Sequence, residues 1–381
     1  MKFSRGYVRS ALAALAAAAA AGCTDPEREA TYGKESFEAG DWKGAVEHYS
    51  KCLEASPGEI DGKIMLARAH LNLGELREAE AALASLPPEN ASDTDVLLVG
   101  AKIDFYAKRH EAAREKFLRV AKDESLDAKT RSEGWAGAGA VDCFAECVSP
   151  GADPVLRDRS RVELLAALRL DRRNPAAYYH LGQLYRDSFG YVDAALQQLR
   201  YFIHLDKSGG KRVQDVAMKA IPALKNERAA KSAARPGAGN RNPREAMALL
   251  SKADALYGKK NYDAASKLYA GALAKDPLSY AAAVGLARSR ERSGNPKDAV
   301  RAYKIAAELD PEAVDAMLAA ARLSSRLGYW ATATSYYSLA LAARDNNRDA
   351  VAGLIAAHEK SGNPKAAEIY RGYLEFLPPA R

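Results

Sequence analysis

Two short stretches near the end of the chain, SGNPK at Ser293 and again at Ser361, place a glycine close to a lysine, as phosphate-binding loops do. Such a loop needs the pattern G-x-x-x-x-G-K-[ST] after a strand, because its backbone amides surround the phosphates and its hydroxyl reaches magnesium. Here a single glycine precedes Lys297, and neither copy supplies the Ser or Thr. The spacing therefore argues against a nucleotide site.

The same stretches read well as turns between helices. Gly294 and Gly362 would end one helix in the left-handed conformation that glycine adopts at no steric cost. Asn295 would cap the next helix, and Pro296 would occupy its first turn. The question then becomes which larger arrangement of helices needs this turn twice.

Other candidates for chemistry are weak. The stretch GAGAVD, which begins at Gly137, has glycines two apart, but it follows a Trp in a helical pattern and not a strand, so it does not predict a dinucleotide site. His48 and Cys52 could share a helix face, yet two ligands do not make a metal site. The six histidines are scattered: His48, His70, His110, His180, His204 and His358. We predict no catalytic residue, no metal and no cofactor, and hence a protein that is not an enzyme.

Three cysteines besides Cys23 leave their own alternatives open. Cys143 and Cys147 stand four apart, so a helix would present them on one face, where regular geometry would strain a disulfide. Two small buried side chains are the favoured interpretation, and the spacing leaves open whether they are bridged. A metal site is disfavoured because no further Cys or His lies nearby in the sequence.

A period of 34 residues runs through the C-terminal third of the chain. Bulky aromatic residues follow the small ones four places later, and prolines follow the first two twelve places later. The columns are Ala265, Ala299, Ala333 and Ala367; Ala253, Ala287 and Ala321; Tyr269, Tyr303 and Tyr337; Ala272, Ala306 and Ala340; Pro277 and Pro311. Near the N-terminus the same spacing relates Ala45, Ala79 and Ala113, and Gly33, Ala67 and Ala101.

This pattern resembles the tetratricopeptide repeat, whose 34-residue unit has small residues at places 8, 20 and 27, an aromatic or Leu at place 24 and Pro at place 32. Two departures are that the family's Trp at place 4 is missing from the regular units and that Ala91 and Asp345 replace the terminal proline. The resemblance implies an all-α fold, a right-handed α-solenoid of antiparallel helix pairs. One pair cannot bury its apolar face alone, so consecutive pairs must stack.

The register divides the chain into four parts. Residues 23–206 would form an N-terminal array of about five helix pairs, and 246–381 a C-terminal array of four. The segment 207–245 would join them as a basic connector, with a helix broken near Pro222 and a Pro/Gly linker. Within 125–206 the pattern is irregular: an inter-helix turn is enlarged by CVSPGADP, and one extra residue precedes Ala195.

The resemblance also implies a partner-binding groove, because first helices line the inner surface of such arrays. Places 9, 12 and 13 carry cations and aromatic residues, which would suit an acidic peptide or a C-terminal carboxylate. The alternative is a solvated face whose cations pair with neighbouring Asp and Glu, and the Lys and Asn of the tail-binding clamp of chaperone cochaperones are missing. The predicted groove residues are Lys34, Arg68, Lys102, Phe105, Tyr106, Arg288, Arg292, Arg322 and Arg326.

Charge is concentrated in the connector. The whole chain has a formal charge of +7, and 207–244 holds ten Lys or Arg against Asp215 and Glu227. Such a run is usually a solvated hinge. A contact with anionic headgroups or an anionic envelope polymer is the other interpretation, whereas nucleic acid is disfavoured because aromatic residues are not interleaved.

The first 22 residues have the layout of an export signal, with a basic start and an Ala/Leu run of 11 residues that is too short to span a bilayer. Ala21 and Gly22 before Cys23 resemble the lipobox of bacterial lipoproteins, although Ala20 stands where Leu is usual. The resemblance implies a lipid on Cys23 that anchors the chain without spanning the membrane. Thr24 after it favours the outer membrane by the sorting rule of enteric bacteria.

Together these features predict a lipid-anchored, periplasm-facing bacterial scaffold that binds a protein or peptide partner in envelope assembly, secretion or export. The rival is an enzyme-associated or catalytic envelope protein with an unrecognised site in 125–206. A pocket with convergent polar groups in that stretch would favour the rival.

Overall fold

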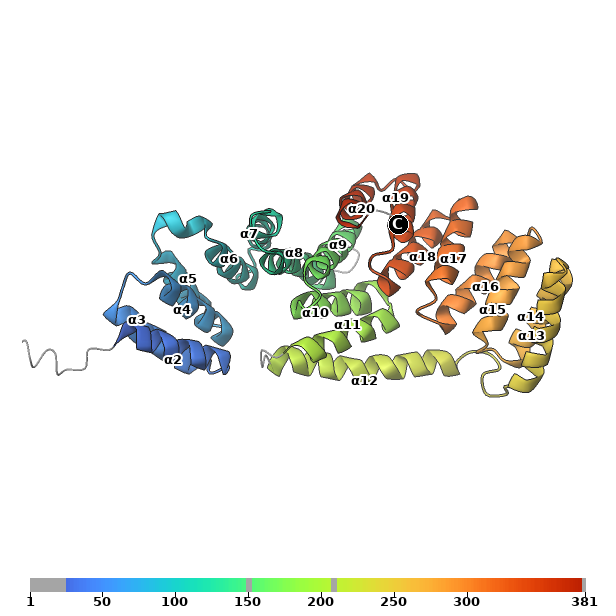
Figure 1. Cartoon of the computed structure of the whole chain (residues 1–381), viewed down its shortest axis with the longest axis horizontal. Helices are drawn as coiled ribbons and strands as arrows, with labels where there is room; N and C mark the ends of the chain where they lie inside the picture. Colours follow the sequence, from blue (N-terminus) through green and yellow to red (C-terminus); the bar gives the residue numbers. More distant parts are fainter. Residues whose placement is uncertain (1–24, 149–152, 207–210, 379–381) are drawn as a thin grey trace, which may run out of the picture. The chain divides into compact units, whose positions relative to one another are not determined.

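The computed structural model describes residues 25–148, 153–206 and 211–378, all as helices and their connections, with no strand among them. These residues form two compact units (Figure 1): unit 1 comprises 25–126, and unit 2 comprises 127–206 with 211–378. The predicted α-solenoid of helix pairs is confirmed, and each unit is described by itself below.

Unit 1 contains three helix pairs. Each helix packs against the next, as the repeat requires. A short 3₁₀ turn, Pro88–Ser92, precedes the third pair. The helices are α2 (Pro26–Glu38), α3 (Trp42–Ala55), α4 (Ile60–Leu73), α5 (Leu76–Ala84), α6 (Thr94–Tyr106) and α7 (His110–Lys122).

Unit 2 begins with two long helices and ends with four regular pairs. Its first part comprises α8 (Ala128–Val148), α9 (Pro154–Leu170), α10 (Pro175–Leu184), α11 (Val192–Leu205) and α12 (Lys211–Ala233). Its second part comprises α13 (Pro243–Gly258), α14 (Tyr262–Lys275), α15 (Tyr280–Arg292), α16 (Pro296–Leu309), α17 (Val314–Arg326), α18 (Trp330–Ala343), α19 (Arg348–Lys360) and α20 (Pro364–Phe376).

The residues that recur every 34 positions make the contacts between neighbouring helices. The alanines of the places 8 and 20 columns in the second part of unit 2 are fully buried, because helix backbones approach closely there. Each bulky place-24 tyrosine lies over the first helix of the next repeat. The ring of Tyr269 covers Gly285, and that of Tyr337 covers Gly353, so that an added Cβ would come within 2.3 Å and 2.2 Å of those rings, respectively.

The SGNPK stretches are turns between helices, as the sequence predicts. Gly294 and Gly362 have φ of 81° and 79°, and Pro296 lies in the first turn of α16. The expected side-chain cap is wrong: Asn295 occupies the N-cap position, but its amide Nδ2 donates to Oγ of Ser293 at 3.0 Å and makes no bond to the helix N-terminus. The turn therefore stabilises itself and leaves the helix start without a side-chain cap.

The irregular middle region has a specific geometry. The extra residue predicted before Ala195 is accommodated by a π-helical turn, Tyr185–Phe189, at the end of α10, and Gly190 closes it with φ of 67°. A π turn absorbs one residue more than an α-turn, and such turns are frequent at functional sites. Side chains beyond Tyr185 are thereby rotated relative to the regular repeat.

The segment predicted as a basic connector is mostly helix α12, which packs against α11. The predicted break near Pro222 is wrong, because the helix continues through that residue. Pro222 is exposed to solvent, and its missing N–H is tolerated on the outer side of a helix at the cost of a local bend.

Unit 2 joins helices that the repeat register assigned to different arrays. The last helix, α20, packs against α9, and one continuous core contains buried residues from 136–224 and from 307–377 (Figure 1). The sequence grouped 127–206 with the N-terminal repeats, whereas the compact units group it with the C-terminal ones. Contacts far apart in sequence, which a 34-residue period does not encode, account for this difference.

Candidate functional site

The predicted groove residues of unit 1 lie on α2, α4 and α6. Lys34 and Lys102 are exposed, and Tyr106 is 59% exposed. Phe105 is half-buried and meets Tyr106 edge-on, with ring centroids 5.5 Å apart. Arg68 forms an ion pair with Asp95 at the start of α6, so one predicted cation is neutralised by the next repeat.

The predicted cations of unit 2 lie on α15 and α17. Arg326 Nη2 is 2.9 Å from Glu291 Oε1 on α15, and Arg322 Nη1 is 3.9 Å from Asp349 Oδ2 on α19. Arg322 therefore repeats the geometry of Arg68 in unit 1, in which a place-9 arginine meets a place-2 aspartate of the following repeat. Arg68, Arg322 and Arg326 therefore fit the alternative prediction, a solvated face whose cations pair with neighbouring carboxylates. Each exposed pair of this kind contributes about 0–1 kcal/mol to folding stability.

Arg288 and Arg292 differ from these pairs. Both are exposed on α15, four residues apart and hence on one face, and neither forms an ion pair with any residue that the structure describes. The charge of Arg288 acts on three neighbouring phenols, those of Tyr269, Tyr280 and Tyr303. Burial raises the pKa of Tyr303 to about 12, and Glu291 adds to the shift. We call Arg288 and Arg292 the free cation pair of unit 2.

Cys23, the predicted lipid site, lies outside the described residues. Within the described ranges no helix is both long and apolar enough to cross a bilayer, and no three His, Cys, Asp or Glu side chains converge as a metal site would require. Cys143 is buried, and its Sγ lies 3.5 Å from the backbone oxygen of His180. The side chain of Cys147 is outside the described part, so the bridge between the two stays an open question.

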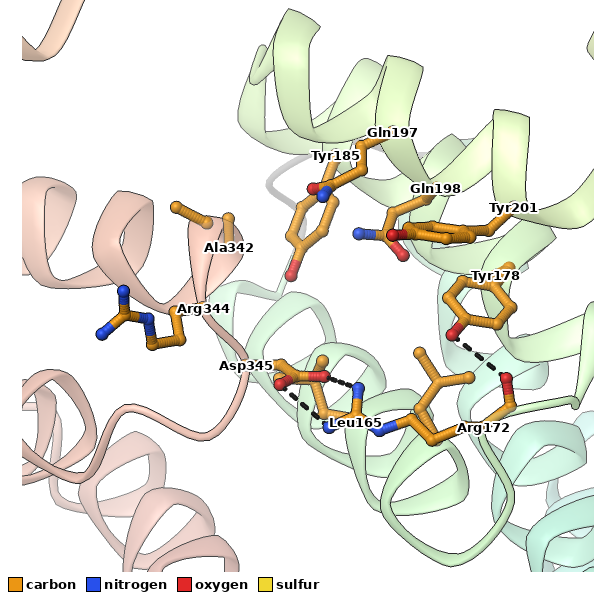
Figure 2. Close-up of a pocket in the computed structure, with 12 residues that line it drawn as sticks. Leu165, Arg172, Tyr178, Tyr185, Gln197, Gln198, Tyr201, Ala342, Arg344 and Asp345 are labelled. Carbon is orange, nitrogen blue, oxygen red and sulfur yellow. Dashed lines mark hydrogen bonds and ion pairs between the residues drawn. The ribbon is translucent and has the colours of Figure 1, made fainter. Parts of the chain in front are cut away.

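A pocket of about 330 Å³ lies in unit 2 (Figure 2), where α9, α10 and α11 meet the turn between α18 and α19. None of the predicted site residues lines it. Its lining residues are Leu165, Leu168, Arg172, Tyr178, Tyr185, Gln197, Gln198, Tyr201, Ala342, Ala343, Arg344 and Asp345.

An ion pair forms one side of this pocket. The Arg172 guanidinium holds both carboxylate oxygens of Asp345, with Nη2 3.2 Å from Oδ1, and this bond raises the pKa of Arg172 (Figure 2). The Tyr178 hydroxyl donates to the backbone oxygen of Arg172 at 3.2 Å. The hydroxyl of Tyr373, on α20, donates to the backbone oxygen of Asp345 at 2.8 Å. Hydrogen bonds from α10 and from α20 therefore hold the Arg172–Asp345 pair in place.

Three buried or half-buried polar groups at the pocket form no hydrogen bond with the part of the chain that the structure describes. Tyr185 is only 1% exposed, yet its hydroxyl makes no hydrogen bond with any described residue, and the same holds for the half-buried side-chain amides of Gln197 and Gln198. Burial raises the pKa of Tyr185, which keeps its hydroxyl protonated at neutral pH. These groups can thus both donate and accept hydrogen bonds towards the pocket.

A buried charge cluster holds α20 against α9 beside the pocket. Arg161 is 0% exposed, and its Nη2 lies 3.0 Å from Oδ1 of Asp158. Tyr370 on α20 donates to the same Asp158 oxygen at 2.6 Å. The ring of His358 stacks on that of Tyr370, with centroids 5.6 Å apart, and burial lowers its pKa. We call Asp158, Arg161, His358 and Tyr370 the α9–α20 cluster.

None of the residues predicted from the sequence belongs to this site, although two departures from the repeat lie at it. Asp345 stands where the family has its terminal proline, and that replacement supplies the partner of Arg172. The extra residue before Ala195 produces the π turn that begins at Tyr185. Both were noted as departures from a regular repeat, and the period alone could not show that they face one another.

Comparisons with known proteins agree with the helical repeats. Models described as "Tetratricopeptide repeat" match residues 36–103 and residues 219–280 and 284–348, which together cover just over half of the chain. The match from 219 begins inside α12, within the segment predicted as connector. No curated protein matches the sequence.

Solved structures with similar helical arrangements share little sequence with the chain. The Cut9–Hcn1 hetero-tetramer of the APC/C is 14% identical, covering 93% of this chain and 79% of that chain, with a TM-score of 0.36. The TPR domain of P58(IPK) is 16% identical, with coverage of 89% and 99% and a TM-score of 0.28. The TPR2AB domain of yeast Sti1, in complex with pHSP90, is 16% identical, with coverage of 92% and 100% and a TM-score of 0.26.

The family matches coincide with helix pairs whose small and bulky columns are buried as the repeat requires. The chain therefore contains tetratricopeptide repeats, as the two sets of columns at 34-residue spacing predicted.

Proposed function

We propose that the chain is a non-catalytic scaffold for protein–protein interaction, held at a bacterial membrane by a lipid on Cys23 and serving envelope assembly, secretion or export. Tetratricopeptide domains bind protein or peptide partners, and the yeast Sti1 domain named above is in complex with pHSP90. The observation that carries the proposal is the free cation pair of unit 2, because two unpaired arginines among tyrosines suit an acidic segment or a C-terminal carboxylate.

A charge-reversal experiment tests the binding face. We expect Arg288→Glu combined with Arg292→Glu to abolish capture of partners from native membranes, because like charges across a contact are strongly unfavourable. The matched control is Lys297→Glu with Arg301→Glu on α16, which makes the same change of charge at the same spacing on a second helix. Capture should persist in the control. An identical set of partners in both variants would return Arg288 and Arg292 to the solvated surface.

The lipid anchor needs a separate experiment. Cys23→Ser should release the chain from membranes into the soluble periplasmic fraction, since none of the described helices is long and apolar enough to cross a bilayer in place of the lipid. Exposed lysines and arginines on α12 could still hold it to anionic headgroups, each contributing roughly 1 kcal/mol. High salt distinguishes the two, because it releases a charge contact and leaves a lipid anchor in place. Retention of Cys23→Ser in membranes at high salt would contradict the anchor.

One observation favours the rival function, a catalytic site in 125–206. The pocket of Figure 2 lies largely in that stretch. Among the described residues that line it, however, there is no His, Cys, Ser or Lys, and its one carboxylate, on Asp345, is engaged with the guanidinium of Arg172. These groups suit the binding of a ligand.

A further inference from the structure

The pocket beside the α9–α20 cluster is a built site. Its volume of about 330 Å³ lies at the lower end of the range of about 300–1,000 Å³ that is usual for small-ligand pockets. It exists because two parts of unit 2 meet: α9 to α11 supply most of the lining, and the α18–α19 turn supplies Ala342 to Asp345. It lies apart from the free cation pair on α15.

Its unsatisfied polar groups lie on the same side of the open space. Figure 2 shows the ends of Tyr185, Gln197 and Gln198 across from the Arg172–Asp345 pair. The ring of Tyr185 is buried, and because the side chain lines the pocket its hydroxyl is available to a ligand or water there. Tyr185 continues α10 with helical dihedrals, and the π turn begins at this residue.

Of the charged side chains that line the pocket, Arg172 and Asp345 form a pair, and Arg344 lies at the edge. Arg172 and Asp345 neutralise one another through two hydrogen bonds, and Figure 2 shows the guanidinium of Arg344 directed away from the other lining groups. A charged ligand would find no unpaired opposite charge inside. Apart from the hydroxyl of the exposed Tyr201, the free groups inside are two amides and the Tyr185 phenol, each of which both donates and accepts, so the ligand must offer neutral groups of both kinds.

Apolar walls flank these polar groups. On one side, Tyr178 and Tyr201 form a tilted ring pair with centroids 5.2 Å apart, and Tyr201 is 46% exposed. Ala342 lies on the opposite side (Figure 2). A pyranose ring has hydroxyls around its rim and apolar C–H faces, which matches this arrangement. We propose that the pocket binds one or two rings of a neutral sugar chain, with a face on Tyr201 and rim hydroxyls on Tyr185, Gln197 and Gln198.

A peptide is the other neutral ligand with donors and acceptors, but the geometry favours the sugar. Backbone recognition would need amide groups arranged along an extended groove, whereas the three free groups here converge on one short space. The proposal is independent of the scaffold function, because it uses different residues and a different face of unit 2.

Saturation-transfer NMR on the full-length protein tests the proposal with three neutral disaccharides, cellobiose, maltose and di-N-acetylchitobiose. We expect at least one to bind, and Gln197→Ala with Gln198→Ala to weaken its Kd about fivefold for each hydrogen bond lost. Tyr185→Phe removes only the hydroxyl and keeps the buried ring, so it should weaken binding about fivefold without unfolding.

Gln183→Ala is the matched control, because its amide donates to Tyr179 on the same helix at 2.9 Å and does not line the pocket. It should leave the Kd unchanged, and circular dichroism on all variants verifies folding. The proposal is overturned if no disaccharide binds, if binding is insensitive to the Tyr185 and glutamine substitutions, or if only the neutral peptide N-acetyl-alanyl-alanine methylamide binds.

Discussion

At the scale of single residues, the packing between repeats depends on the absence of a methyl group. In α19, a Cβ on Gly353 would lie 2.2 Å from the ring of Tyr337, which is itself buried. The pairing of Gly285 with Tyr269 repeats this contact 68 residues earlier. The glycines are therefore required by the neighbouring ring and not by a turn, since both lie inside helices.

We expect Gly353→Ala to lower the free energy of unfolding by about 1–3 kcal/mol, because the ring or the helix must shift to admit the methyl group. Gly372→Ala, in α20, is the control: nothing lies within 4 Å of the added Cβ, so alanine should raise stability by about 0.5–1 kcal/mol through its helix propensity. Urea titration followed by circular dichroism measures both. Equal effects of the two substitutions would show that the Tyr337 contact is unimportant.

At the scale of elements, one turn geometry recurs after the first helix of many repeats. Gly40, Gly74 and Gly328 adopt positive φ there, like the two SGNPK glycines. Lys108 and Lys260 occupy the same place with φ of 63° and 60°, where a side chain is unfavourable. These two turns are therefore strained positions in otherwise regular helix pairs.

Replacing the strained lysine should stabilise the protein. We expect Lys260→Gly to raise the free energy of unfolding by about 0.5–1 kcal/mol, because relief of the left-handed conformation exceeds the extra chain entropy of glycine. Its neighbour Lys259 has φ of −80°, so Lys259→Gly should give no gain. Thermal unfolding of the two variants measures the difference, and the idea fails if Lys259→Gly stabilises as much as Lys260→Gly.

The sequence predicted the helix pairs and their turns, because small residues, a bulky ring and glycine recur at fixed spacing and each contact lies within or between adjacent repeats. It also placed Arg322 and Arg326 on a common face. It could not identify their pairing with Asp349 and Glu291, since a cation at a groove position looks the same whether paired or free. The pocket was out of reach for another reason: Arg172 and Asp345 are 173 residues apart, and no period relates them.

At the scale of the whole molecule, buried charged side chains connect the early and the late helices of unit 2. The α9–α20 cluster includes a fully buried arginine, whose Nε and Nη1 find no hydrogen-bond partner among the described residues. Phe189 lies against its guanidinium, with the ring centroid 4.5 Å from Cζ. Such a cluster stabilises little by itself, but removing one charge leaves the other uncompensated, at a cost of about 3–5 kcal/mol.

Stability should fall in mild acid. Burial lowers the pKa of His358 and brings that of His180 to about 4. The folded state thus binds fewer protons than the unfolded state below about pH 6.5, and stability decreases as the pH falls from there towards the folded values. For His180 the loss at pH 5 is roughly 2 kcal/mol. Thermal unfolding at pH 7 and pH 5 measures it.

A double variant isolates the histidine contribution. His180→Gln with His358→Gln removes both titrating groups, so its Tm should depend less on pH over this window than that of the unchanged chain. Asp158 opposes the shift of His358 whereas Arg157 and Arg161 reinforce it, and all three remain in the variant. If the two proteins lose stability equally between pH 7 and pH 5, other groups govern the acid response.

The contact between α20 and α9 also limits how many repeats the protein can gain or lose, and it affects folding during synthesis. An open helical array gains or loses a repeat at its end with little consequence, because each repeat touches only its neighbours. Deleting α19 and α20 here would instead uncover Arg161 and Asp158, which lie 209 and 212 residues before Tyr370, so the number of repeats between them is fixed. During synthesis, the surface of α9 must wait for the last helix to leave the ribosome, which makes late truncation as damaging to the middle of the chain as to its end.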